Sequence, residues 1–375
     1  MTTTSILFTI PNLDTAGSGR AMARVMRGLE ELGFRTAICV NRPGGSLQDD
    51  LEAQGVEVLV HPLQVPVAPR HTLVTRARDA AKPLRGRFDI WHSYDYRDDY
   101  TEPLLARFAH ARWAFTKKNM SWNHRSWWAR TVQAKGIAAQ NTDMLRDFFR
   151  GPVLSRHARY VPRGISLAPP PDPALGLALR AELGIAADAP VIACVAQIIP
   201  RKGQHLLVEA LPDLPGAHLL LAGAVTYEPY GERVRTAIDR AGVGDRVHWL
   251  GHVSDIDPVL AATDVFSLPT GDQAEGCPVA LLEAMAAEVA VVATDVPGSR
   301  DVVNSDRNGI VVPRDDVPSL AAALRRLLDD PAERATFATA GRQRVADTFT
   351  LEAEVAAHAA LYREMMGSRE MMGQR

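Results

Sequence analysis

The stretch that most constrains how this chain can fold runs from residue 270 to residue 297. A strand ending at Leu268 leads into the loop Asp272–Pro278, and an apolar segment, Val279–Ala287, follows it. Proline suits the first position of a helix, where its missing N–H is not needed, and the apolar positions of the segment repeat with a helical period. We therefore predict a helix that begins at Pro278, with the loop placed at its N-terminus.

The N-terminus of this helix is suited to an anion, because its unpaired N–H groups and the positive end of its dipole favour a group such as a diphosphate. Glu275 precedes the terminus, and Glu283 lies inside the helix. Carboxylates do not bind an anion, but they accept hydrogen bonds from hydroxyl groups, which a nucleotide sugar has in quantity. The stretch therefore predicts a site for a nucleotide sugar.

The composition is that of a globular protein with two domains. The chain has 375 residues, of which 46% are hydrophobic and 23% charged, enough to bury two cores. Its three scattered cysteines, Cys39, Cys194 and Cys277, suit a reducing compartment and give no metal-ligand spacing. The sequence has no apolar run long enough for a membrane span, and its start reads as a strand instead of a signal peptide. We expect a cytoplasmic protein without a metal cofactor.

Charge is distributed unevenly along the chain. Residues 1–168 hold 24 lysines and arginines against 15 acidic residues, whereas residues 169–375 hold 18 against 29. The bias is sharpest from residue 104 to residue 163, with 12 basic and 2 acidic residues. Such a field attracts anions. Two interpretations stay open: a domain with a basic surface of no special function, or a surface for an anionic acceptor or the acidic inner face of the plasma membrane.

Strands and helices alternate along the chain, which predicts an α/β fold with two parallel sheets. The strands are expected at residues 6–10, 36–40, 56–59, 88–92, 112–116, 137–139 and 159–161, and then at 191–197, 218–222, 246–249, 265–268, 289–293 and 309–312. Four prolines between residues 169 and 173 make a stiff connection. We predict a first domain over residues 1–168, a second over 169–350, and a C-terminal helix and tail over 351–375.

The block from Ala262 to Pro313, which contains GCPVALLEAMA and the two glutamates Glu275 and Glu283, resembles the donor-binding block of family 4 glycosyltransferases. The resemblance implies the GT-B fold: two Rossmann-like domains that face each other across a cleft, with a C-terminal helix that crosses back to the first domain. It also implies transfer of a sugar from a nucleotide diphosphate sugar with retention of configuration, without a metal and without a protein nucleophile.

The resemblance assigns roles in catalysis and donor binding. Glu275 would contact a hydroxyl of the transferred sugar, Lys202 would neutralise the diphosphate, and Glu283 would hold the ribose. The residues implied to bind the donor are Gly17, Gln197, Lys202, Gly223, Val253, Gly276, Cys277, Pro278, Val279 and Glu283. The family pattern has an arginine where this chain has Gln197. We therefore expect an altered phosphate site, to which Arg201 could contribute by turning inward.

Acceptor contacts are expected from the first domain. Gly17 and Gly19 lie in a predicted loop, residues 11–20, ahead of a helix. A histidine that is common in the family is missing here, because the chain reads Thr116-Lys117-Lys118. The candidates for acceptor binding are Arg20, His92, Lys118, Trp122 and His124. Five of the six tryptophans lie between residues 91 and 128, and packing in the core competes with acceptor contact as their role.

The sequence thus predicts a retaining glycosyltransferase. It would move a hexose or N-acetylhexosamine from a UDP- or GDP-sugar to a hydroxyl of an anionic or lipid-linked acceptor, in the biosynthesis of a polysaccharide, glycolipid or glycosylated metabolite, without binding nucleic acid. Three alternatives stay open. These are another enzyme of the same fold, such as a nucleotide-sugar epimerase or a phosphorylase; a non-catalytic module that binds sugar nucleotides; and a nicotinamide dehydrogenase, for which Gly17-Ser18-Gly19 is weak support.

Overall fold

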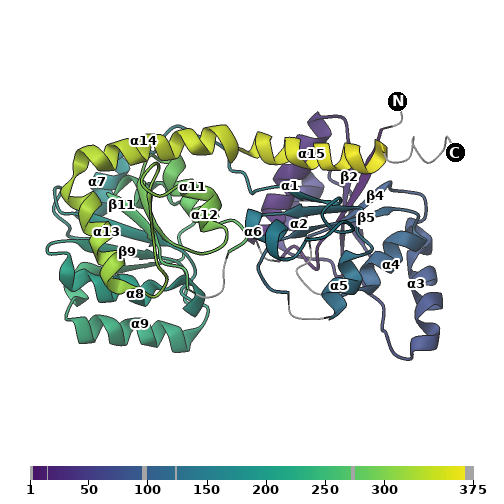
Figure 1. Cartoon of the computed structure of the whole chain (residues 1–375), viewed down its shortest axis with the longest axis horizontal. Helices are drawn as coiled ribbons and strands as arrows, with labels where there is room; N and C mark the ends of the chain where they lie inside the picture. The colour runs from purple at the N-terminus through teal and green to yellow at the C-terminus, as the bar shows by residue number, and fades with distance from the viewer. Residues whose placement is uncertain (1–2, 15, 95–98, 123–124, 272–274, 368–375) are drawn as a thin grey trace. The chain divides into compact units, whose positions relative to one another are not determined.

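The computed structural model describes residues 3–14, 16–94, 99–122, 125–271 and 275–367 (Figure 1). The chain divides into two compact units. The first comprises Met1–Pro162 together with Leu351–Arg375, and the second comprises Arg163–Thr350. Each unit has its own hydrophobic core and its own parallel sheet, so the predicted α/β fold with two parallel sheets is confirmed.

The first unit is built on a seven-stranded sheet of order β3-β2-β1-β4-β5-β6-β7. Its strands are β1 (Ser5–Thr9), β2 (Arg35–Val40), β3 (Val58–Val60), β4 (Ile90–Ser93), β5 (Arg112–Lys117), β6 (Gly136–Ala139) and β7 (Ala158–Tyr160). The central strands β1, β4 and β5 are buried along almost their whole length because helices cover both faces of a parallel sheet. These helices are α1 (Ala16–Glu31), α2 (Ser46–Ala53), α3 (Leu73–Ala81), α4 (Thr101–Phe108), α5 (Arg125–Thr131) and α6 (Thr142–Asp147).

The second unit is built on a six-stranded parallel sheet of order β10-β9-β8-β11-β12-β13. The strands are β8 (Val191–Val195), β9 (His218–Ala222), β10 (Val247–Gly251), β11 (Val265–Leu268), β12 (Ala290–Thr294) and β13 (Ile310–Val312). The helices are α7 (Pro173–Glu182), α8 (Gln204–Ala210), α9 (Glu228–Ala241), α10 (Asp257–Ala261), α11 (Val279–Ala286), α12 (Ser299–Val302), α13 (Val317–Asp329) and α14 (Pro331–Thr348). All of the strands lie within two residues of the predicted positions.

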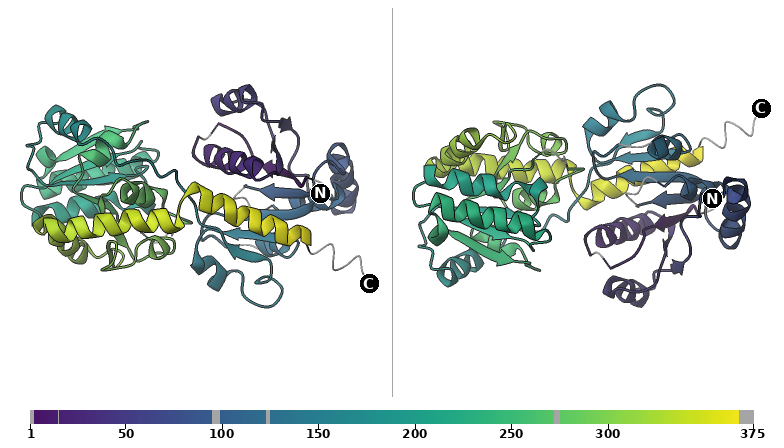
Figure 2. Two further views of the ribbon diagram at one scale, coloured as in Figure 1. Left: turned by 90° about the horizontal axis from the view of Figure 1, so that it is seen from above. Right: turned by 90° about the horizontal axis from the view of Figure 1, so that it is seen from below.

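The last helix, α15 (Leu351–Gly367), belongs to the first unit although it follows the second in sequence. It packs against α1, and the three views of Figures 1 and 2 draw it, in yellow, beside the first sheet. A Cβ atom added at Gly28 of α1 would lie 2.6 Å from Cγ2 of Val355. Glycine at this position therefore permits the close contact that returns the chain to the first unit.

Four details differ from the sequence-based predictions. The boundary between the two units lies between Pro162 and Arg163 in the sequence, and not after residue 168 as predicted. Residues 163–168 belong to the second unit because Ile165 pairs with Thr350 and Arg342 donates to the carbonyl oxygen of Ala168. The predicted loop over residues 11–20 is wrong in its second half, since α1 begins at residue 16 and includes both glycines. Pro278 precedes α11 as its N-cap, and the helix itself begins at Val279. Helices α3 to α7 were not predicted.

Within the described part of the chain, no helix is both long enough and apolar enough to cross a membrane.

Candidate functional site

The carboxyl ends of β8 and β11 mark the point where the strand order of the second sheet reverses. Open α/β sheets bind their ligands at such a switch point, because the two connections leave the sheet in opposite directions and open a space between them. The connection after β8 carries Gln197 and a 3-10 turn, Pro200–Lys202. The connection after β11 leads to Glu275 and to α11. Most of the predicted donor residues therefore lie on the connections at this edge of the second sheet.

Lys202 and Glu275 are brought into contact there, although 73 residues separate them in the sequence. Nζ of Lys202 lies 2.5 Å from Oε1 of Glu275, and the two side chains are 14% and 13% exposed. An ion pair that is largely shielded from water is screened less than one on the open surface. The pair thus gathers one positive and one negative group at the switch point, where a phosphate and a sugar hydroxyl could each find a partner.

Glycines let the connections approach each other closely. Gly203, directly after Lys202, has φ 68°, and a Cβ atom there would lie 2.0 Å from the carbonyl oxygen of Pro269. Gly271 N–H donates to the carbonyl oxygen of Arg201 at 2.8 Å. Gly298, ahead of α12, has φ 88°, and its Cβ would lie 2.9 Å from the carbonyl oxygens of Glu275 and Gly276. The connections after β8, β11 and β12 therefore support one another.

Gln197 lies beside Gly223, because a Cβ atom at Gly223 would come within 1.9 Å of the carbonyl oxygen of Ala196. The side chain of Gln197 is exposed, while its carbonyl oxygen accepts a hydrogen bond of 2.9 Å from Nε2 of Gln204. The nearby Arg201 has a buried Nε atom without a hydrogen-bond partner among the described residues. Sequence reasoning missed the supporting roles of Gln204 and Gly298; the glycine ahead of a predicted helix was the one available signal.

The remaining donor candidates surround the start of α11 or follow β10. Gly276 and Pro278 are buried, whereas Cys277, Val279 and Glu283 are half-buried. Val253, two residues after β10, is half-buried and packs against the core of the second unit. Residues 272–274 of the predicted loop lie outside the described residues. The described residues include no group of three or more histidine, cysteine or acidic side chains that could hold a metal ion.

His92 is not on a surface of the first unit, so the prediction of acceptor contact through this side chain is wrong for this structure. Its Nε2 atom is 2.8 Å from Oγ1 of Thr116, and its Nδ1 atom is 2.8 Å from the hydroxyl oxygen of Tyr362 on α15. The side chain has no exposed area. Burial lowers the pKa of His92 well below its usual range. His92 therefore belongs to a buried polar cluster that holds α15 against the sheet.

Other acceptor candidates take varied positions. Arg20 and Gly17 are exposed on α1. The amine of Lys118 donates to the carbonyl oxygen of Tyr94 and lies 5.5 Å from the centre of its ring. Trp122 is half-buried and stacks on Phe148, with ring centres 5.0 Å apart. His124 lies outside the described residues.

The tryptophans of the first unit serve mainly as packing. Trp91, Trp113 and Trp127 are buried in the core, whereas Trp128 is 61% exposed. Trp122 is half-buried and packs against the same core, so the interpretation of this group as packing is correct for four of its five members. Trp128, three residues after the exposed Arg125 on α5, is the member with an exposed ring.

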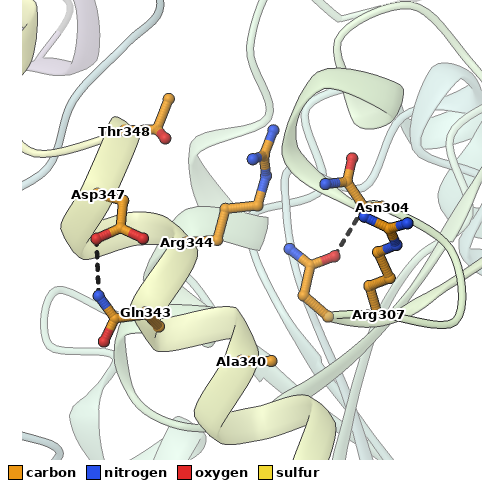
Figure 3. A pocket seen from close by; sticks show the side chains of 8 residues that line it. Asn304, Arg307, Ala340, Gln343, Arg344, Asp347 and Thr348 are labelled. Carbon is orange, nitrogen blue, oxygen red and sulfur yellow. Dashed lines mark hydrogen bonds between the residues drawn. The ribbon is translucent and has the colours of Figure 1, made fainter.

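A separate hollow of about 260 Å³ lies in the second unit, between residues 304–308 and the last turns of α14 (Figure 3). All of its lining residues except Ala340 have polar side chains. Gln343 donates to Asp347 on one side, and the backbone N–H of Asn304 donates to the side chain of Asn308 on the other. None of the residues predicted for the donor site lines this hollow. The hollow is therefore distinct from the site at the switch point.

Known proteins match the second unit in sequence and nearly the whole chain in structure. The family model described as "Glycosyl transferases group 1" matches residues 177–344, within the second unit. Over 199 residues the chain is 36% identical to the GDP-mannose-dependent monoacylated alpha-(1-6)-phosphatidylinositol monomannoside mannosyltransferase of Corynebacterium glutamicum, a match that covers 50% of this chain and 51% of the relative. The chain thus spans about half the length of the mannosyltransferases it matches.

Solved structures match over nearly the whole chain. A glycosyltransferase from Rickettsia africae has a TM-score of 0.85 at 18% identity, covering 98% of this chain and 99% of that one. Anabaena Alr3699/HepE, in complex with UDP and glucose, has a TM-score of 0.81 at 19% identity, covering 96% and 99%. At these identities the likeness shows the fold. Residues 177–344 of the second unit thus match the glycosyl transferases of group 1, in agreement with the resemblance to family 4, and the chain has the two-domain GT-B fold.

Proposed function

We propose that this protein is a glycosyltransferase that moves a sugar from a nucleotide diphosphate sugar to a hydroxyl group of a lipid-linked or anionic acceptor. The observation that carries the proposal is the contact between Lys202 and Glu275 at the switch point of a sheet whose residues match the group 1 family. GDP-mannose is the first donor to test, because relatives that are 36% and 33% identical to the matched part of the chain are named as GDP-mannose-dependent. UDP-sugars are the second choice, since Alr3699/HepE is described with UDP and glucose.

In this proposal the cationic and anionic residues of the second unit contact different parts of the donor. Lys202 stabilises the negative charge that develops on the leaving diphosphate, since a fixed cation in a shielded site acts strongly on such charge. Glu275 accepts a hydrogen bond from a hydroxyl of the transferred sugar, and Glu283 does the same for the ribose. The N–H groups at the start of α11 face the phosphates. Transfer with retention, without a metal or a protein nucleophile, is part of the proposal.

Arg201 supplies the positive charge that Gln197 lacks. Its Nε atom is buried and has no partner among the described residues, and a buried guanidinium nitrogen without an acceptor is costly. A phosphate oxygen from the donor would remove this cost. Gln197, whose side chain is exposed, adds at most a neutral hydrogen bond.

The proposed acceptor surface belongs to the first unit, and its exposed Arg125 and Trp128 suit the acidic face of a membrane. Peripheral binding at the inner face of the plasma membrane is therefore included in the proposal. Sedimentation with vesicles of phosphatidylglycerol and of phosphatidylcholine tests it: binding is expected to the acidic vesicles and to weaken with salt. Equal binding to both vesicles, or binding to neither, would contradict it.

The donor is tested by thermal denaturation with GDP, UDP, GDP-mannose and UDP-glucose, each with and without magnesium. A ligand that binds the folded state raises the melting temperature in proportion to RT ln(1 + [L]/Kd). We expect a rise for one nucleotide family, equal with and without the metal, and loss of that rise in the variant K202M but not in K135M, which removes an exposed lysine of the first unit. The absence of a shift with every nucleotide would overturn the proposal.

A further inference from the structure

Lys117, the last residue of β5, is a buried cation of the first unit that the proposed mechanism does not use. Its side chain is 1% exposed. The Nζ atom lies 3.8 Å from the ring centre of Trp127 on α5, and 5.6 Å and 5.9 Å from the ring centres of Phe148 and Trp122. In its protonated form, an amine enclosed by three aromatic rings is held by cation–π attraction, which is stronger where water is excluded.

The same amine also binds the connection that follows β5. It donates to Oδ1 of Asn119 at 3.0 Å and to the carbonyl oxygen of Ser121 at 2.5 Å. An ammonium group has three N–H donors and no acceptor. Two of these donors meet oxygen atoms of the connection, and the third is available to the face of Trp127. Through these contacts Lys117 holds the connection, at Asn119 and Ser121, against the rings of Trp127 and Phe148.

Asn119 also forms hydrogen bonds within the connection. Its Oδ1 atom also accepts from the backbone N–H of Ser121 at 3.3 Å and from the hydroxyl of Ser121 at 2.7 Å. One amide oxygen thus organises the turn, and the amine of Lys117 ties that oxygen to the core. Without the amine, the carbonyl oxygen of Ser121 would lose its donor, and the turn would be held by its own short-range hydrogen bonds.

The charged groups around Lys117 give it no carboxylate partner of its own among the described contacts. Arg130 on α5 is the charged neighbour that acts on it, and it disfavours a second positive charge. Arg130 is itself paired with Glu102 on α4 at 3.4 Å, and Asp143 on α6 is paired with Arg146. The rings and the oxygen atoms of the connection, and not a counter-ion, therefore hold this amine.

We propose that Lys117 is a positioning residue for the acceptor, because it fixes the connection that presents Lys118 and Trp122, the two described side chains of this segment that we expect to contact the acceptor. This inference rests on the proposed function, since it presumes that the first unit binds the acceptor. It gives a buried lysine a role that neither donor binding nor leaving-group departure requires.

The test compares the variants K117M and N119A with the control K135M. Methionine fills the space of the lysine stem without its donors, and its sulfur keeps a favourable contact with the aromatic rings. N119A removes the acceptor from the other side of the contact and leaves the aromatic rings intact. Hydrogen–deuterium exchange is followed on peptides that cover residues 118–122 and, for comparison, on peptides from β1 and β2.

We expect exchange of residues 118–122 to increase roughly tenfold or more in both variants, with β1 and β2 unchanged and K135M equal to the wild type. In transfer from GDP-mannose to vesicles of phosphatidylinositol, the vesicle concentration for half-maximal rate should rise by a similar factor. The concentration of GDP-mannose for half-maximal rate should stay within about twofold.

Unchanged exchange of residues 118–122 in both variants would overturn the inference, and so would an equal increase over the whole first unit, which would mean that Lys117 acts on stability alone. A change in kcat with both half-maximal concentrations unaffected would also overturn it. If the wild type neither binds a nucleotide nor transfers mannose, the proposed function fails. The exchange of residues 118–122 then still decides whether Lys117 fixes the connection.

Discussion

Replacement of Gly203 by alanine tests whether the close approach of two connections shapes the donor site. Gly203 has φ 68°, a left-handed conformation that costs an L-residue about 1–2 kcal/mol. In addition, its new Cβ atom would lie 2.0 Å from the carbonyl oxygen of Pro269. Relief of such overpacking typically costs about 1–3 kcal/mol more. Gly203→Ala should therefore destabilise the second unit by about 2–5 kcal/mol.

Gly242 provides a matched control. It has φ 64° at the end of α9, and a Cβ atom there would meet nothing within 4 Å. Gly242→Ala therefore carries the backbone cost without the clash and should destabilise by about 1–2 kcal/mol. The difference between the two variants, about 1–3 kcal/mol, isolates the contact with Pro269.

The free energies are measured by native-state hydrogen exchange on peptides from β8 and β9, which report on the second unit alone. Calorimetric titration with GDP then shows whether the displaced connection carries Lys202 away from its site. If it does, the affinity for GDP falls in Gly203→Ala and stays unchanged in Gly242→Ala. Equal destabilisation by the two substitutions would refute the reasoning, because it would mean that the connection after β8 moves away from Pro269 at no cost.

Three further predictions concern the interior and the phosphate site. Glu102→Gln leaves the buried Arg130 without its counter-charge, and it should lower the free energy of unfolding of the first unit by about 3–5 kcal/mol. Glu57→Gln, at an exposed ion pair, should lower it by about 0–1 kcal/mol. Tryptophan fluorescence during unfolding in urea measures both values. Burial lowers the pKa of Lys117 to about 7, from 10.5, so between these values the unfolded chain holds a proton that the folded chain has released. The stability of the first unit should therefore rise from pH 7 to 10.5, and this rise should be missing in K117M. Arg201→Met should weaken GDP binding in a calorimetric titration more than Gln197→Met, and the reverse order would exclude Arg201 from the phosphate site.

The sheets could be predicted from the sequence because their strands are covered on both faces. Strands β8 and β12, for example, are runs of apolar residues with turn residues after them, and this pattern is local. The short helices α4, α5 and α6 have no such pattern, because part of each is polar and buried: Glu102 and Arg130 are enclosed by partners from other elements. Their positions depend on contacts that a local pattern does not contain.

The candidate site was predicted in part, because the positions of some of its residues follow from the local sequence and the order of the strands. Lys202 and Glu275 each follow a strand of a parallel sheet, so the order of strands brings them together. His92 likewise lies near the carboxyl end of a parallel strand, β4. It is nevertheless buried, in contact with Tyr362, which lies 270 residues further along the chain. Whether a residue near the end of a strand meets a ligand or another helix is decided by the element that covers it, and here that element is α15.

The pair formed by Lys202 and Glu275 leads to a prediction that separates a phosphate contact from a sugar contact. In the structure the amine of Lys202 is satisfied by a carboxylate, so a diphosphate has to compete with Glu275 for the same cation. Glu275→Gln keeps the size of the side chain and removes its charge. GDP should therefore bind more tightly to this variant, by up to about 1 kcal/mol or roughly fivefold in Kd.

Transfer should respond in the opposite direction, because an amide accepts a hydrogen bond from a sugar hydroxyl less strongly than a carboxylate does. The expected result is a tighter complex with GDP, measured by calorimetry, together with a slower transfer of mannose from GDP-mannose. Glu283→Gln is the comparison, since this residue is assigned to the ribose, which GDP and GDP-mannose share; the substitution should weaken the binding of both alike. If Glu275→Gln instead weakened GDP binding as much as Glu283→Gln does, Glu275 would be a support for the phosphate site and not a partner of the sugar.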